Sequence, residues 1–166
     1  MKKIAYFFEF ILIKILFTLF QIMGYRLSSN LGFFIGRTIG PIFRSKKMII
    51  QNLEKANIQH SNLSKIASNV LGNYGRIFAE YNYLKKFRNN ELKKYVSIDG
   101  LEHLENLKKQ NKKAVFISGH FNNFELMAME IEKAGIELAA IYRPLNNIFL
   151  NKTMEKIRKE NICKNQ

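Results

Sequence analysis

The side chains in this sequence best suited to moving a proton are His120 and Glu125, which stand five positions apart in the stretch SGHFNNFE. An apolar, strand-like run precedes the histidine, and a helix-like run follows it. Within one continuous helix the two side chains would point about 140° apart, so they could cooperate only across a turn. With His120 in that turn, the Glu125 carboxylate could hold one imidazole nitrogen while the other takes a proton from a substrate hydroxyl. Such a general base suits acyl transfer to an alcohol, with backbone N–H groups at the helix start stabilising the oxyanion.

The same stretch has a second interpretation, in which it only starts a helix. Asn122 is followed three residues later by Glu125, which is the spacing of a capping box, and His120 would then be an incidental turn residue. Spacing alone leaves both interpretations open. The other histidines, His60 in a polar stretch and His103 in a charged one, are typical of solvated side chains.

The sequence does not indicate a metal or a nucleotide site. It lacks a convergent set of metal ligands, a P-loop and a GxGxxG motif, so we expect no metal and no cofactor. The single cysteine, Cys163, has no disulfide partner, which favours a main body that faces a reducing cytoplasm. Its place in a basic tail predicts a solvent-facing thiol.

The period of the apolar residues predicts the elements that position the histidine and the glutamate. Residues 113–118 (KAVFIS) and 136–142 (IELAAIY) read as buried strands, with a helix over 123–134 between them. This order forms a βαβ unit with parallel strands, so His120 and Arg143 would follow strand ends at one edge of the sheet, where open α/β sheets bind ligands. The predicted fold class is α/β, with an incomplete, mostly parallel sheet.

Helical spacing dominates the segments on either side of this unit. Residues 46–87 show apolar positions three and four apart, with Ser61 or Asn62 as a cap, and residues 147–161 form a final basic amphipathic helix. Upstream, three glycines at spacing four predict either a smooth strip for close helix packing or a loosened connector. They are Gly32, Gly36 and Gly40.

The N-terminus predicts membrane association. Residues 4–23 hold thirteen Ile, Leu and Phe but are interrupted by Glu9 and Lys14. Two charges cost about 5 to 7 kcal/mol at a bilayer centre, which nearly balances the free energy gained by inserting the apolar side chains. The segment can therefore be a membrane-spanning helix, an interfacial helix or a buried core helix. The excess of Lys and Arg after this segment would hold the main body on the cytoplasmic side.

The net charge of +14 predicts a polyanionic partner. Nucleic acid is disfavoured, because the basic residues are dispersed, the sequence shows no recognition-helix pattern, and the apolar N-terminus would be unexplained. Anionic lipid or an acidic protein fits better.

Several stretches together resemble the late acyltransferases of lipid A biosynthesis, the lauroyl and myristoyl transferases of the HX4D/E acyltransferase superfamily. HX4E alone is a weak signal, but here it occurs in order with other matching stretches along essentially the whole chain. These are RSKKMIIQNLEKA, NYGRIFAEY, GLEHLENLKKQNKKAVFISGH, SGHFNNFE and IYRPLNN.

The resemblance implies a bacterial inner-membrane enzyme on the cytoplasmic face, without a cofactor. It would move a fatty acyl chain from acyl carrier protein to a hydroxyl of a phosphorylated glycolipid, the lipid A precursor. His120 matches the family's base and Glu125 its partner, while Arg143 and Asn123 match substrate-binding positions. Asn122 departs from the glycine usual at its position. The implied division is into membrane-associated helices over 1–45 and an acyltransferase domain of the glycerolipid-acyltransferase type over 46–166.

Members of that family are about twice as long as this chain, so the resemblance covers their N-terminal half only. The missing half would supply further strands, and residues 136–142 would be left as an uncovered edge. The alternative to an active enzyme is therefore an inactive fragment, or one subunit of a split acyltransferase that retains membrane association and needs a second polypeptide.

Overall fold

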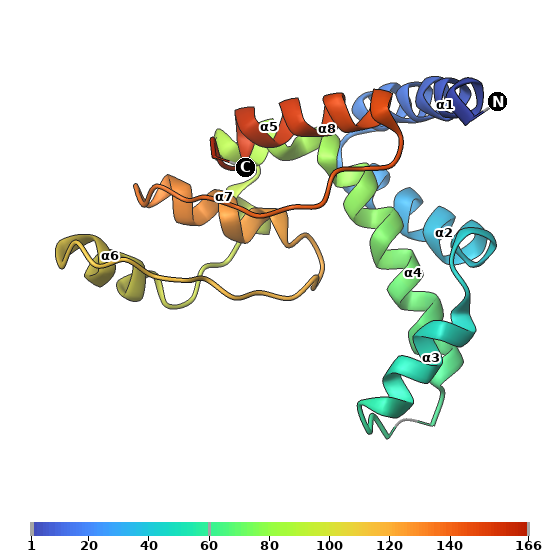
Figure 1. The fold of residues 1–166 in the computed structure, drawn as a ribbon, viewed down its shortest axis with the longest axis horizontal. Coiled ribbons are helices and arrows are strands. Elements are labelled where there is room, and N and C mark those ends of the chain that lie inside the picture. Colours follow the sequence, from blue (N-terminus) through green and yellow to red (C-terminus); the bar gives the residue numbers. More distant parts are fainter. Residues whose placement is uncertain (1, 60, 166) are drawn as a thin grey trace. The chain divides into compact units, whose positions relative to one another are not determined.

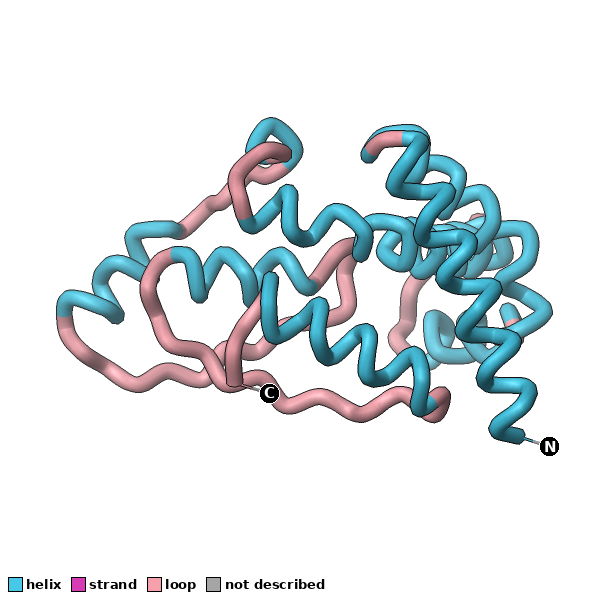
Figure 2. The backbone as a smooth tube through the Cα atoms, turned by 90° about the horizontal axis from the view of Figure 1, so that it is seen from above, coloured by secondary structure: helices cyan, strands magenta, loops and turns pink. Residues whose placement is uncertain are grey.

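The computed structural model describes residues 2–59 and 61–165, and His60 lies outside them. These residues form helices joined by irregular segments, and the described part contains no strand (Figures 1 and 2). They divide into two compact units. One is Phe17–Asn82, and the other contains the described residues of 1–16 and 83–166. The predicted boundary between residues 45 and 46 stays a prediction.

The unit Phe17–Asn82 is built on a close helix pair. Helix α2 (Tyr25–Phe43) packs along α4 (Leu63–Glu80), with α3 (Lys46–Lys55) beside α4. A Cβ placed on Gly32 would lie 2.5 Å from the carbonyl oxygen of Gly75, and one on Gly36 would lie 2.4 Å from that of Leu71. Both contacts are far too short for a real side chain, so glycine is what lets the two backbones approach. Close helix packing, rather than a loosened connector, is therefore the role of the first two glycines of the strip.

A buried carboxylate ties the same two helices together. Glu80 is 5% exposed, and its Oε1 accepts hydrogen bonds from Ser29 Oγ at 2.7 Å and from the Tyr25 hydroxyl at 3.3 Å. Arg76 donates from Nη1 to Ser29 Oγ at 3.2 Å while lying over the ring of Phe33. Hydrogen bonds of this kind offset the cost of burying a charged group.

The second unit contains the stretches that carry the predicted site. Its core includes Leu84, Phe87, Met129 and Met154, which come from three different helices. Besides the first part of α1 (Lys2–Met23), its helical elements are α5 (Leu84–Arg88), η2 (Lys93–Tyr95), α6 (Leu101–Lys109), α7 (Glu125–Lys133) and α8 (Ile148–Asn161), and the short η1 (Tyr81–Tyr83) lies at the division between the units.

The predicted α/β fold with a parallel sheet is wrong. Residues 112–121 and 140–145 have no regular structure, and the β-pairing within the described residues is one isolated parallel bridge between Ala139 and Asn165. Apolar, β-branched runs favour extended backbone, but a sheet also requires a neighbouring chain about 4.8 Å away to complete its hydrogen bonds. The buried strands that were predicted are instead exposed: Val115 is 89%, Ile117 92% and Ile141 104% accessible.

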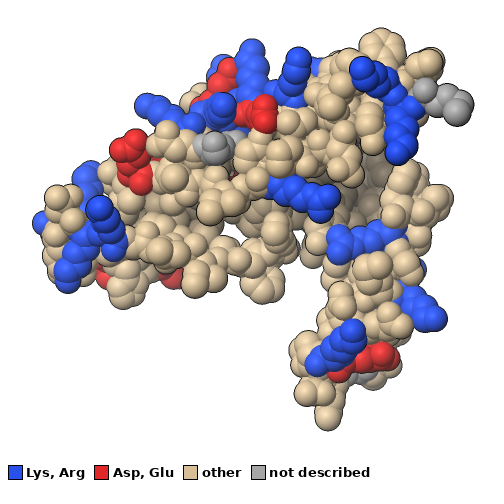
Figure 3. Space-filling view, viewed as in Figure 1, with Lys and Arg blue, Asp and Glu red and all other residues tan. Residues whose placement is uncertain are grey.

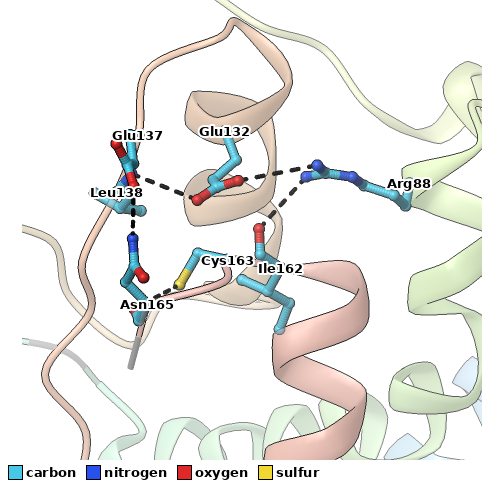
Figure 4. Close-up of polar contacts among 7 residues, drawn as sticks. All are labelled: Arg88, Glu132, Glu137, Leu138, Ile162, Cys163 and Asn165. Atoms are coloured by element: carbon cyan, nitrogen blue, oxygen red, sulfur yellow. Dashed lines mark hydrogen bonds and ion pairs between the residues drawn. The ribbon is translucent and has the colours of Figure 1, made fainter.

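Side chains rather than a sheet hold the segment that follows α7 (Figure 4). Glu132 accepts from the Leu138 backbone N–H at 3.4 Å and pairs with Arg88, which lies 4.0 Å away. Asn165 Nδ2 donates to Glu137 at 3.1 Å. Cys163 is 2% exposed and contacts the Asn165 carbonyl, so the prediction of a solvent-facing thiol is also wrong.

Candidate functional site

The turn that carries His120 leads directly into α7. Residues 112–121 are irregular, Asn122 has a left-handed backbone with φ +44°, and α7 starts at Glu125. The N-cap of α7 is Phe124, and no side chain makes the capping hydrogen bond. The capping box predicted from Asn122 and Glu125 is therefore not formed. The helix start instead leaves Glu125 in the first turn of α7.

Glu125 is held by an arginine from α8. Its side chain is buried, and Oε1 accepts from Arg158 Nε at 2.9 Å and from Arg158 Nη2 at 2.6 Å. Both partners are largely shielded from solvent, with the arginine side chain 19% and the carboxylate side chain 8% exposed. Charge-assisted bonds of this length are among the strongest in proteins. Sequence reasoning missed Arg158, because nothing in a basic amphipathic helix distinguishes one arginine from its neighbours.

A tyrosine and a second carboxylate support this arginine. The Arg158 guanidinium lies 5.2 Å from the ring centre of Tyr142, and the Tyr142 hydroxyl donates to Glu155. Asn151 Nδ2 also donates to Glu155, at 3.0 Å. The hydrogen bond to Glu155 raises the pKa of Tyr142, and the same bond lowers the pKa of Glu155. Tyr142, which precedes Arg143 in the sequence, thus lies against the guanidinium of Arg158, the residue that binds Glu125.

His120 is not hydrogen-bonded to Glu125. Its side chain is exposed, and its ring stands edge-on to Phe124 with 4.3 Å between the ring centres. The dyad of His120 and Glu125 therefore stays a prediction. Arg143 is exposed, and Asn123 is half-buried with its carbonyl accepting from the Leu126 N–H.

One cavity collects most of these residues. It has a volume of about 1270 Å³ and is lined by His120, Glu125, Arg143 and Arg158 together with Tyr142. Asn123 is not among its lining residues. Apolar side chains from α7 and from the extended segments complete the wall, including Val115, Phe116, Met127, Ile131 and Leu138. A cavity with more apolar than polar lining, and with basic, acidic and imidazole side chains among its walls, suits a ligand that has a hydrocarbon chain and a polar reactive group.

Metal ligands are not grouped in the part of the chain that the structure describes, where no cluster of three His, Cys, Asp or Glu could hold an ion. Basic side chains are spread over the face drawn in Figure 3, with acidic ones among them, rather than gathered on one element.

Comparison with known proteins gives one match. No curated protein and no solved structure matches the chain. The family model described as bacterial lipid A biosynthesis acyltransferase matches residues 1–163, a range that includes every residue lining the cavity. It also includes the apolar helix α1, which by length and composition is long enough to cross a membrane. The chain belongs to the bacterial lipid A biosynthesis acyltransferase family.

Proposed function

We propose that this protein transfers a fatty acyl chain from acyl carrier protein to a hydroxyl of a phosphorylated glycolipid, the lipid A precursor, with His120 as the general base. Membership of an acyltransferase family supports the reaction type. The observation that carries the assignment is that His120, Glu125, Arg143 and Arg158 line one largely apolar cavity.

In the proposed reaction the imidazole of His120 accepts the proton of the acceptor hydroxyl as its oxygen attacks the thioester carbonyl. The tetrahedral intermediate then collapses: the new ester C–O bond remains, the C–S bond breaks, and the proton passes from the imidazolium to the leaving thiolate. His120 is exposed at the cavity, so a substrate hydroxyl can reach it. The oxyanion would be stabilised by backbone N–H groups of the turn before α7, other than those of Phe121 and Phe124, which already donate to carbonyls within the turn.

The two arginines take different parts in this proposal. Arg158 has its charge matched by Glu125, so it acts as a positioning residue that holds α7 and the turn before it against α8. Arg143 is exposed at the cavity and serves as the cation that binds an anionic group, a phosphate of the acceptor or of the carrier's prosthetic arm. Glu125 can assist His120 directly only if the turn moves.

The proposed location is the cytoplasmic face of the bacterial inner membrane. Support comes from the membrane-associated family, from the apolar helix α1, and from the excess of Lys and Arg that follows it in the sequence.

The test is turnover of acyl-carrier-protein thioester by the detergent-purified chain, comparing His120→Ala with His103→Ala. His103 is a matched control, because its side chain is 80% exposed on α6 and it does not line the cavity. We expect His120→Ala to lose about 10²- to 10⁴-fold in kcat and the control to keep full activity. Equal activity of the two variants would exclude His120 as the base.

A second candidate is that the chain acts as one subunit of a split acyltransferase. The observation that favours it is the exposure of Val115, Ile117 and Ile141, which leaves extended apolar backbone uncovered beside the cavity. A second polypeptide that covers these side chains would raise activity from near zero, whereas full His120-dependent turnover by the chain alone would rule this candidate out.

A further inference from the structure

Helix α2 turns its small side chains towards the protein and its large apolar ones away from it. Its buried residues are Ser28, Ser29, Gly32 and Gly36, and the two glycines meet the backbone of α4. In a helix that packs on a water-soluble core, the large apolar residues occupy the buried face instead. Small residues towards a neighbouring helix, with large apolar residues outside, are typical of helices that contact lipid.

The outward apolar residues of α2 form one stripe. At about 100° per residue they fall within a sector roughly 120° wide, whose centre lies roughly 135° from that of the buried face. Leu27, Phe34 and Ile42 are 61%, 62% and 80% exposed. Thr38 is the polar residue in this sector, and its hydroxyl donates to the Phe34 carbonyl at 2.8 Å. The stripe consists of Leu27, Leu31, Phe34, Ile35, Pro41 and Ile42.

The charges on and around α2 suit an anionic surface. Arg26 and Arg37 are exposed and lie on one flank of the stripe, roughly 100° to 120° from its centre. An arginine at that angle extends sideways when the stripe faces a bilayer, so its guanidinium lies at the level of the headgroups. Arg44 and Lys47, both exposed, follow the end of the helix. The sequence contains no Asp or Glu from residue 10 to residue 53, so the whole neighbourhood is basic.

A lipid surface fits this face of α2 better than a protein partner does. The stripe lies on the convex side of a single helix, and a fluid bilayer covers such a side without a pocket of matching shape. Gly24 alone separates α2 from the end of α1 at Met23. Of the helices that the structure describes, α1 is the one long and apolar enough to cross a membrane, so α2 begins next to the segment best suited to lipid.

We propose that α2 lies in the plane of the membrane surface, with its stripe among the acyl chains and with Arg26 and Arg37 at anionic headgroups. The inference rests on the membrane association in the proposed function, and it adds a second contact with lipid besides α1. The small residues then have a clear role, because they let α4 cover the inner face of α2 while the outer face stays open to lipid. Two lipid contacts give the unit Phe17–Asn82 a fixed orientation at the membrane.

The test measures depth along α2 for the full chain in vesicles of phosphatidylglycerol and phosphatidylethanolamine. Cys163→Ala first removes the native thiol, which is buried. A fluorophore on a single cysteine at Leu27, Phe34 or Ile42 reports its depth through lipids that carry quenchers at different acyl positions. We expect one shallow depth at all three positions. A label at Glu54, an exposed residue of α3, is the control and should stay in water. Labels on α2 as open to a water-borne quencher as this control would overturn the proposal.

A label at Ile15 on α1, which is 54% exposed, separates this result from the proposed function. Lipid quenching at Ile15 without quenching on α2 would overturn the inference and leave the membrane association standing. Quenching at neither helix would overturn both. Shielding of the Phe34 label by acyl carrier protein or by a second copy of the chain, with no shielding by vesicles, would also overturn the inference.

Vesicle binding by charge variants gives an independent check. The double variant Arg26→Gln with Arg37→Gln should weaken binding to the anionic vesicles about 25-fold, because each cation near such a surface contributes roughly fivefold. Its binding to vesicles of phosphatidylcholine alone should not change.

The matched control is Lys93→Gln with Lys109→Gln. It removes the same net charge from two exposed residues that lie outside the unit Phe17–Asn82, so binding to the anionic vesicles should fall much less. Equal losses in the two double variants would show that only the net charge matters and would overturn the proposed contact of α2 with headgroups.

Discussion

Arg158 donates two hydrogen bonds to a single oxygen of Glu125, from Nε at 2.9 Å and from Nη2 at 2.6 Å, and so joins α8 to the first residue of α7. Glu125, which the spacing in the sequence predicts as a partner for His120, is therefore held by a residue 33 positions downstream. The pair lies at the cavity wall, where its loss affects both the stability of the fold and the position of the turn that carries His120.

Breaking this ion pair from one side should destabilise the protein more than removing both partners. Arg158→Met or Glu125→Leu leaves a charged group buried without its partner, and we expect each to cost about 3 kcal/mol of unfolding free energy. The double variant Arg158→Met with Glu125→Leu should recover much of that loss. Chemical unfolding in detergent measures all three in one cycle.

The control for that cycle is Lys156→Met on the same helix. Lys156 pairs with Glu160 at 3.8 Å, but the side chains are 75% and 58% exposed, so its loss should change stability very little. If the variants of the Arg158–Glu125 pair lost as little unfolding free energy as this control, the pair would have no structural role.

Tyr142→Phe should alter the pH dependence of stability. The hydrogen bond from Tyr142 lowers the pKa of Glu155 below its ordinary 4.5 and, from the other side, raises that of Tyr142 above 10.0. The contribution of Glu155 is thus present above pH 4.5 and is lost as the pH falls through its lowered pKa. The contribution of the tyrosine is present below pH 10.0 and is lost as the pH rises through its raised pKa.

In the Tyr142→Phe variant we expect the pKa of Glu155 to return towards its ordinary value. The acid loss of melting temperature that is due to Glu155 should then shrink, because its folded and unfolded pKa values approach each other, and the alkaline loss that is due to this tyrosine should disappear. If the melting temperature of the variant fell with acid pH as it does in the native protein, the hydrogen bond between Tyr142 and Glu155 would not contribute to stability in solution.

Replacing glycines of α2 by alanine should separate the cost of overpacking from the gain in helix propensity. A Cβ at Gly36 would meet the Leu71 carbonyl oxygen at 2.4 Å, whereas one at Gly40 would meet the Leu71 Cβ at 3.1 Å. We expect Gly36→Ala to cost about 1 to 3 kcal/mol through overpacking. Gly40→Ala should be close to neutral, because a tight but yielding contact is offset by a gain of about 1 kcal/mol in helix propensity. Thermal unfolding followed by circular dichroism compares the two variants. A Gly40→Ala variant less stable than Gly36→Ala would contradict the close packing of α2 on α4.

Replacing Arg143 should weaken acceptor binding without affecting the fold. Arg143→Ala removes an exposed cavity cation, so we expect KM for the phosphorylated acceptor to rise about tenfold with little change in kcat. Arg143→Lys should restore part of that loss. Lys109→Ala, an exposed cation on α6 outside the cavity lining, serves as the control. A kcat effect without a KM effect would assign Arg143 to the chemical step instead.

Local signals were enough to predict the helices. Asn62 caps α4 by accepting from the Lys65 N–H at 2.8 Å, and α8 begins after Asn147, as their positions in the sequence predict. The predicted helix over 123–134 is found as Glu125–Lys133. Capping and the spacing of apolar residues act over one or two turns, so they can be read without knowing the rest of the fold.

The sequence by itself determined where most of the helices form and which chemistry an imidazole and a carboxylate at that spacing could serve. Tertiary structure alone decided that residues 113–118 and 136–142 form no strand, that Glu125 binds Arg158, and that Asn147 donates a hydrogen bond to Glu9. The physical reason is the range of the interactions. Helical hydrogen bonds close within four residues, whereas strand pairing and buried ion pairs depend on partners brought from elsewhere in the chain.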